Sequence, residues 1–276
     1  MLKTRIITAI ALLAVLLPAL FYPNPNAFHA VALVLIGAAA WEWCKLNGYS
    51  QIASFLIAAG AISICAAAWF YGLIGAEMPL LWTVTGAAWV LVGAWLMAHG
   101  PSVWPKIPQT LRLVLGVLAL CLAWLALAQA RVRGVEFLLS VLLLVWVADI
   151  GAYFAGRSLG GRFTKSKLAP SISPGKTWEG VWGAIASVLV MAFVWAFASS
   201  ENLYAQLRGR HGLVFLAVAA LFMVAISVVG DLVESLVKRA AGAKDSSNLL
   251  PGHGGVLDRV DALLPALPLA MMLVSL

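Results

Sequence analysis

The chain has 276 residues, of which 63% are hydrophobic and only 11% are charged, and its formal net charge is +7. A soluble globular domain carries about 25% charged residues, so this composition excludes an ordinary soluble fold and predicts that lipid covers much of the surface. The positive charge does not indicate nucleic-acid binding, because no basic segment is interleaved with aromatic residues in the manner of RNA-binding surfaces. It is typical of lysines and arginines gathered in cytoplasmic loops.

Apolar runs separated by polar or Gly/Pro-rich breaks predict an all-α polytopic integral membrane protein with about nine transmembrane helices. The first run follows Lys3 and Arg5, and no small-residue cleavage site follows it, so we expect an uncleaved first span. The last run is short and contains Pro265 and Pro268. The expected span cores are residues 6–22, 28–44, 52–71, 79–98, 111–129, 136–154, 180–199, 212–231 and 260–276.

The basic residues favour one orientation, with the N-terminus in the cytoplasm. All but four of the 18 lysines and arginines then fall on the cytoplasmic side, and the exceptions are Arg131, Arg133, Arg208 and Arg210. This asymmetry favours an odd number of spans with the C-terminus outside. The two longest polar loops, 155–179 and 232–259, would share the cytoplasmic face. We expect residues 1–135 to form about five N-terminal spans and residues 136–276 to form the catalytic region.

Acidic residues gather around the second of these loops. If the eighth helix continues past its apolar run, one of its faces carries four polar residues at spacings of three and four, namely Asp231, Glu234, Ser235 and Lys238. Carboxylates at the membrane edge are costly and usually functional. Convergence of Asp231, Asp258 and Asp261 from two helices therefore predicts a site for a hard cation, with Mg²⁺ the expected occupant where phosphate is the substrate. Helix capping by Asp258 and Asp261 is the alternative interpretation.

A glycine-rich turn lies between these acids. Gly252, Gly254 and Gly255 would free the backbone to point its N–H groups at an anion. His253 could donate to a phosphate or simply cap the turn, and an ordinary flexible turn is the alternative. Positive charge surrounds the turn and comes from Lys238, Arg239, Lys244 and Arg259. Acids, cations and glycines together are what a metal–phosphate complex requires.

The first polar loop contains the segment SISPGKTWEG, residues 171–180. Its GKT is not a P-loop, because Pro170 stands where that motif needs glycine. Ser173, Lys176 and Thr177 could instead hold a phosphate, while Glu179 favours the start of the following helix. The competing interpretation of this segment is a helix cap accompanied by cytoplasmic lysines.

Two further acids lie near predicted spans. Asp149, close to the end of the sixth span, is an intramembrane carboxylate and therefore a candidate functional residue. Glu42 stands between two tryptophans, and we expect it at the membrane interface. The charges gather on one face of the membrane, whereas those of a transporter should line a path through the bilayer.

In these segments the chain resembles the phosphatidate cytidylyltransferase (CDP-diacylglycerol synthase) family. The shared pattern is Ser-x-apolar-Lys-Arg, then Lys-Asp, Pro-x-His-Gly-Gly and Asp-Arg-x-Asp, with every spacing kept. The segments ADIGAYFAGR and SPGKTWEG also look like the family. The positions that carry the pattern are Ser235, Lys238, Arg239, Lys244, Asp245, Pro251, His253, Gly254, Gly255, Asp258, Arg259 and Asp261.

The resemblance implies transfer of a cytidylyl group from CTP to phosphatidate, a divalent cofactor that is typically Mg²⁺, and a homodimer in the bacterial inner membrane with its active site facing the cytoplasm. On this interpretation Asp231, Asp258 and Asp261 are metal ligands. The other predicted catalytic residues are Lys238, Arg239, Lys244, Asp245 and His253. The predicted substrate-binding residues are Ser173, Lys176, Thr177, Glu179, Asp149, Gly254, Gly255 and Arg259. Another membrane lipid phosphotransferase or kinase, and a transporter, are the alternatives.

Overall fold

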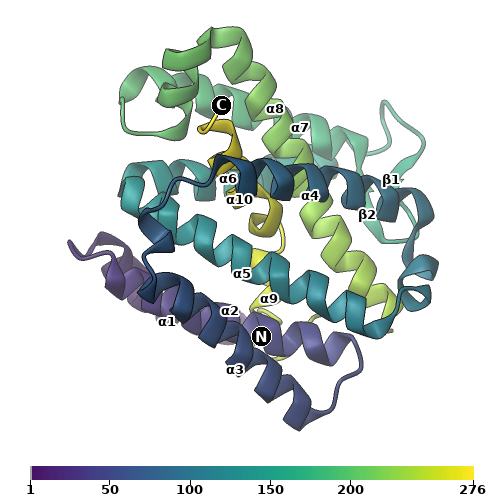
Figure 1. Cartoon of the computed structure of the whole chain (residues 1–276). Coiled ribbons are helices and arrows are strands. Elements are labelled where there is room, and N and C mark those ends of the chain that lie inside the picture. Colours follow the sequence, from purple (N-terminus) through teal and green to yellow (C-terminus); the bar gives the residue numbers. More distant parts are fainter. Residues whose placement is uncertain (1) are drawn as a thin grey trace. The chain divides into compact units, whose positions relative to one another are not determined.

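The computed structural model describes residues 2–276, with side chains from Thr4 onward, and it is built almost entirely of helices (Figure 1). The long helices are α1 (Leu2–Phe21), α2 (Asn26–Leu46), α3 (Gln51–Phe70), α4 (Pro79–His99), α5 (Gln109–Arg133), α6 (Val135–Leu159), α7 (Trp178–Ala198) and α8 (Leu203–Ala240). The short elements are η1 (Leu73–Gly75), η2 (Pro101–Lys106), β1 (Lys167–Ala169), β2 (Ser173–Thr177), α9 (Leu257–Val260) and α10 (Leu263–Leu273). The predicted all-α polytopic class is confirmed.

Eight helices in the described part of the chain, α1 to α8, are long and apolar enough to cross a membrane, which is one fewer than the expected number of about nine. In place of the expected last span, 260–276, the structure has the short helix α10, which follows the one-turn helix α9. The 11 residues of α10 rise about 16 Å, roughly half the thickness of a bilayer core, and Pro268 interrupts them. The segment is buried nonetheless, and Arg210 Nη1 donates to the Val274 carbonyl at its far end.

Helix α8 begins earlier and ends later than the predicted span of 212–231. Its helical geometry breaks at Gly212, where φ is +84°, a backbone conformation that glycine adopts without the steric cost of a Cβ. Beyond this kink the helix runs without a further break to Ala240. The continuation past Asp231 on which the predicted polar face depended is therefore confirmed.

The segment between α6 and α7 is not a plain loop. Strands β1 and β2 pair as an antiparallel hairpin in which Lys167 faces Thr177 and Ala169 faces Ser173. The GKT sequence lies inside β2 in an extended conformation, so its backbone does not wrap around an anion as a P-loop does, and the exclusion of that motif is confirmed.

The helices pack into two compact units. Unit 1 comprises residues up to Glu77, Ser102–Val135 and Val237–Asp261, and unit 2 comprises Met78–Pro101, Glu136–Leu236 and Ala262–Leu276. The predicted partition at residue 135 concerned function rather than packing, and it stays a prediction.

Small residues bring helices close together inside each unit. In unit 1, a Cβ at Gly116 of α5 would collide with the indole of Trp43 on α2. In unit 2, a Cβ at Gly183 of α7 would lie 2.7 Å from the carbonyl oxygen of Gly151 on α6. Such close approach is typical of helix pairs in membranes, and it brings the polar residues at the end of α6 beside the start of α7.

Candidate functional site

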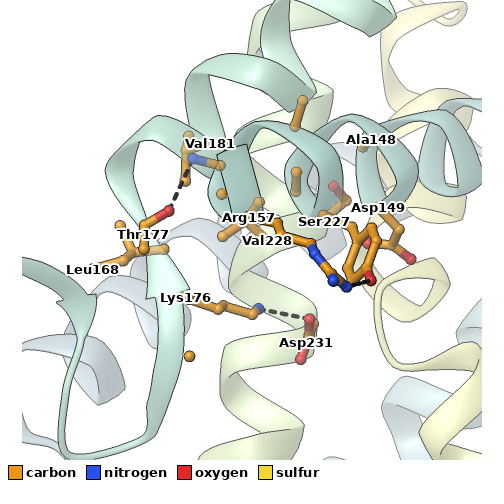
Figure 2. Close-up of a pocket in the computed structure, with 16 residues that line it drawn as sticks. Ala148, Asp149, Arg157, Leu168, Lys176, Thr177, Val181, Ser227, Val228 and Asp231 are labelled. Carbon is orange, nitrogen blue, oxygen red and sulfur yellow. Dashed lines mark hydrogen bonds and ion pairs between the residues drawn. The ribbon is translucent and has the colours of Figure 1, made fainter. Parts of the chain in front are cut away.

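A pocket of about 530 Å³ opens in unit 2 where α6, the β1–β2 hairpin, α7 and α8 meet (Figure 2). Its wall is apolar along one part and polar along another. The polar side chains that line it are Asp149, Tyr153, Arg157, Lys176, Thr177, Ser227 and Asp231. Two carboxylates and two cations therefore face one cavity, which is the mixture required to bind a phosphate together with a metal ion.

An ion pair joins two sides of this pocket. The Lys176 ammonium on β2 lies 2.6 Å from Asp231 Oδ2 on α8, and Figure 2 shows the lysine extending toward the helix. Ser235, one turn further along α8, donates its hydroxyl to Asp231 Oδ1 at 3.3 Å. Both charged side chains remain partly exposed, at 24% and 32%, so an anionic substrate can reach them.

Helix α6 contributes a second polar group from residues spaced four apart. Asp149, Tyr153 and Arg157 lie on the same helical face, and all three line the pocket. Arg157 Nη1 donates to the Tyr153 hydroxyl at 2.7 Å. The structure thus places Asp149 and Asp231 in one cavity, a pairing that the sequence did not indicate.

Two predicted substrate-binding residues also have structural roles. Thr177 Oγ1 caps α7 by accepting the Gly180 N–H at 3.1 Å, the role weighed as the alternative for this segment. Glu179 is buried, and its Oε1 accepts the Thr164 N–H at 2.8 Å and the Thr164 hydroxyl at 2.9 Å. Glu179 therefore fixes the start of the hairpin. Ser173 begins β2 outside the pocket lining, and contact of any of these three with substrate stays a prediction.

The second polar cluster lies in unit 1 and centres on Asp258. Its Oδ1 lies 2.6 Å from the Lys238 ammonium. Its Oδ2 accepts the backbone N–H groups of Ser246 at 2.9 Å and Gly255 at 2.7 Å, and the Ser246 hydroxyl lies 2.9 Å away. The anion that the glycine-rich turn binds in this structure is thus the protein's own carboxylate, and Asp258 organises the α8–α9 loop, residues 241–256.

The turn itself is a tight, hydrogen-bonded structure. Leu250 and Gly254 form an isolated β-bridge, and Arg259 donates from Nε to the His253 carbonyl at 3.1 Å. Gly254 has φ +81°, and a Cβ there would lie 2.7 Å from Asp258 Oδ2. Glycine is therefore required at this position for both its conformation and its lack of a side chain.

The remaining predicted residues lie around this cluster. Arg239 is exposed at the end of α8 and donates to the Ala243 carbonyl, Lys244 and Asp245 are exposed in the α8–α9 loop, and Asp261 is half-buried at the C-cap of α9. Asp231 belongs to unit 2, whereas Asp258 and Asp261 belong to unit 1. Among residues 2–276 no group of three or more His, Cys, Asp or Glu side chains is gathered as a metal site, and the three-aspartate set stays a prediction.

The sequence interpretation did not predict the burial of Glu42. The side chain is fully buried in unit 1, and it accepts hydrogen bonds from the α8–α9 loop and the start of α9. The signal was available, since an acid inside the apolar run 28–44 is costly and usually functional. Its expected depth at the membrane interface stays a prediction.

The fold and these clusters define a helical membrane protein with charged side chains gathered in a pocket of unit 2 and in a loop of unit 1. A sequence profile of the cytidylyltransferase family matches residues 3–276, and the chain belongs to that family. It is 38% identical to a phosphatidate cytidylyltransferase of Pseudomonas aeruginosa over 97% of this chain and 95% of that protein. It is 38% identical to the enzyme of that name from Haemophilus influenzae over 97% and 96%, and 36% identical to that from Brucella suis over 96% and 90%.

Proposed function

We propose that this protein transfers the cytidylyl group of CTP to phosphatidate, giving CDP-diacylglycerol and pyrophosphate. The observation that carries the proposal is the match over nearly the whole chain to relatives named for this activity. The unit 2 pocket supports it, because a cavity with both apolar and charged walls suits a lipid that ends in a phosphate. We further propose that the protein acts as a homodimer in the bacterial inner membrane, with the site facing the cytoplasm.

In the reaction, a phosphate oxygen of phosphatidate attacks the α-phosphorus of CTP. A new P–O bond forms, the bond between the α-phosphorus and its bridging oxygen to the β-phosphate breaks, and pyrophosphate leaves. Both reactants are anions, so repulsion between them is the main obstacle. The lipid phosphate needs no strong base, and catalysis therefore depends on positioning and on charge stabilisation.

The chain supplies cations for this task in both polar clusters. Lys176 and Arg157 line the unit 2 pocket, where they would neutralise phosphate oxygens and hold the reacting groups in line. Lys238, held by Asp258, would serve the leaving pyrophosphate together with Lys244 and Arg259 of the glycine-rich segment. The Lys176–Asp231 ion pair would open as phosphate competes with the carboxylate for the ammonium.

The pocket residues fit a divalent cation. Mg²⁺ is usually held by one or two carboxylates together with substrate phosphates and water, and Asp149 and Asp231 provide two carboxylates in one cavity beside the Ser227 hydroxyl. A bound Mg²⁺ would supply neutralisation of the phosphate charge. Asp258 and Asp261 remain proposed ligands from the family pattern, and near-normal turnover of Asp258→Asn at saturating Mg²⁺ would show that assignment to be wrong.

The decisive test is incorporation of labelled CTP into lipid by the purified protein. We expect labelled lipid only when phosphatidate and Mg²⁺ are both present, with pyrophosphate released in equal amount. A panel of CTP, ATP and CDP-alcohols distinguishes this activity from another lipid phosphotransferase or kinase. Folded protein that incorporates no label, or that moves a solute across liposomes without CTP, would overturn the proposal.

A further inference from the structure

The carboxylate of Glu42 lies at the centre of a buried hydrogen-bond cluster in unit 1. Its side chain comes from α2 and is fully shielded from solvent. Its Oε1 accepts the Ser247 hydroxyl at 2.5 Å and the Val256 N–H at 3.0 Å. Its Oε2 accepts the Leu257 N–H at 2.6 Å and lies 3.1 Å from the Ser246 hydroxyl.

Each carboxylate oxygen of Glu42 thus receives one backbone N–H. A hydroxyl can reverse its hydrogen bond, but a backbone N–H can only donate. A glutamine amide could therefore satisfy one of these two N–H groups and would point its own donors at the other. The geometry requires a carboxylate.

The surrounding chain is shaped to admit this carboxylate. A Cβ at Gly255 would lie 2.5 Å from Glu42 Oε1 and 2.7 Å from its Cδ. A buried carboxylate is also costly to desolvate unless several donors compensate it, and an apolar side chain would fill the same helical position at lower cost. We infer that the Glu42 carboxylate holds the α8–α9 loop in place and is not needed for the packing of α2.

Glu42 connects to the predicted catalytic residues through Ser246. The Ser246 hydroxyl lies 3.1 Å from Glu42 Oε2 and 2.9 Å from Asp258 Oδ2, and the Ser246 N–H donates to the same Asp258 oxygen. Asp258 in turn holds the Lys238 ammonium at 2.6 Å. A continuous path of four side chains thus runs from α2 to the end of α8.

We propose that Glu42 is a positioning residue for cytidylyl transfer: it fixes the α8–α9 loop so that Asp258 and Lys238 take their working positions. This inference rests on the proposed function for its activity readout and on the geometry for its placement. Displacement of a reacting group by about 1 Å can cost about 100-fold in rate, so a loosened loop should lower turnover before it unfolds the protein.

The test compares Glu42→Gln with Glu136→Gln. Glu136 is a matched control in unit 2, because its carboxylate also accepts side-chain hydrogen bonds, from Trp195 and Ser199, and it lines no part of the pocket. Per folded enzyme, we expect Glu42→Gln to lower kcat for labelled CTP incorporation by about 10- to 100-fold with a much smaller change in KM. Glu136→Gln should lower the melting temperature and leave kcat near that of the unaltered protein.

Two further readouts separate positioning from general stability. Hydrogen exchange of the peptide covering residues 244–258 should accelerate in Glu42→Gln and stay unchanged in Glu136→Gln. Ser246→Ala should lower kcat less than Glu42→Gln does, and the double variant should lose about as much as Glu42→Gln alone, because the two act along one path.

The outcomes distinguish this inference from the proposed function. If the unaltered protein incorporates label and Glu42→Gln keeps its kcat, or loses activity only in proportion to unfolded protein, Glu42 has no positioning role. If the rate of hydrogen exchange in residues 244–258 is the same in Glu42→Gln as in the unaltered protein, that result alone shows that Glu42 does not anchor the loop. If the unaltered, folded protein incorporates no label, the proposed function fails, and the exchange experiment still decides whether Glu42 anchors the loop.

Discussion

At the scale of single residues, the unit 2 pocket contains an ion pair that should open when substrate binds. The Lys176–Asp231 ion pair is partly exposed, and exposed pairs contribute little to stability, with a median of about 0 to 1 kcal/mol. Its value must therefore lie elsewhere than in holding the fold. Under the proposed function, a phosphate would take the lysine from the aspartate, and the freed carboxylate would then be available to a cation.

Replacing Asp231 by asparagine should accordingly separate stability from activity. We expect Asp231→Asn to change the melting temperature little and to lower kcat/KM for CTP by about 100-fold or more, an effect typical of losing a group that stabilises transition-state charge. Steady-state kinetics with labelled CTP measures this. Lys167→Gln, an exposed lysine of β1 that does not line the pocket, is the control and should behave as the unaltered protein does. A near-normal kcat/KM for Asp231→Asn would remove the residue from the site.

The glycine-rich turn offers a paired test of conformation and contact. Gly252 and Gly254 both have positive φ, at +78° and +81°, so alanine at either should cost about 1 to 2 kcal/mol of stability. Only the Gly254 Cβ would meet Asp258, whereas the Gly252 Cβ would meet the flexible side chain of Arg5. We expect similar losses of melting temperature and a loss of turnover in Gly254→Ala alone. Equal kcat in the two variants would contradict the contact with Asp258.

At the scale of elements, the sequence predicted what depends on local spacing and missed what depends on tertiary pairing. The polar face of α8 followed from residues three and four apart, and the helix does run through them. The β1–β2 hairpin was not predicted, because its strands have only three and five residues and the second contains Pro174 and Gly175. Strands this short show no clear alternation of apolar and polar residues. The hydrogen-bond partners of Glu42 could not follow either, since they lie about 200 residues away in the sequence.

Helix α1 makes hydrogen bonds near both of its ends with residues distant in the sequence, and local sequence patterns do not predict these contacts. Thr8 near its start donates to the Pro251 carbonyl of the glycine-rich turn at 2.9 Å. Near its end, buried Arg131 of α5 donates to the carbonyls of Leu20 and Tyr22 at 2.9 and 2.7 Å. The helix between these points is mostly exposed in the chain and so would face lipid. These polar contacts therefore add to the packing of α1 against α2.

Removal of the hydrogen bonds from α5 to α1 should lower the stability of the protein without lowering its activity. Arg131→Ala removes the donor to the Leu20 carbonyl, which is buried, and to the Tyr22 carbonyl, which is part-buried, at a cost of about 1 to 3 kcal/mol. We expect a lower melting temperature in detergent and an unchanged kcat per folded enzyme, measured by thermal unfolding and CTP incorporation. Val132→Ala, at an exposed position next to Arg131, should show neither change. A loss of kcat in Arg131→Ala would show that α1 contributes to the site more directly than its contacts indicate.

At the scale of the whole molecule, the eight helices of spanning length bear on the proposed orientation. The hairpin follows the sixth of these helices and the α8–α9 loop follows the eighth. If each helix crosses the membrane once, both segments emerge on the side where the chain starts. Both segments precede α9 and α10, so the side on which they emerge does not depend on whether a ninth span exists.

The orientation can be tested with an impermeant thiol reagent on intact cells. The native cysteines, Cys44, Cys65 and Cys121, are all buried, so their background should be low. We expect Ser171→Cys in the hairpin and Ala243→Cys in the α8–α9 loop to react only after the cells are opened, and Glu201→Cys, between α7 and α8, to react in intact cells. Reaction of Ser171→Cys and Ala243→Cys on different sides would contradict the span count, and reaction of both in intact cells would reverse the orientation. A cytoplasmic side is what the proposed function requires, since a nucleotide triphosphate such as CTP does not cross the bilayer.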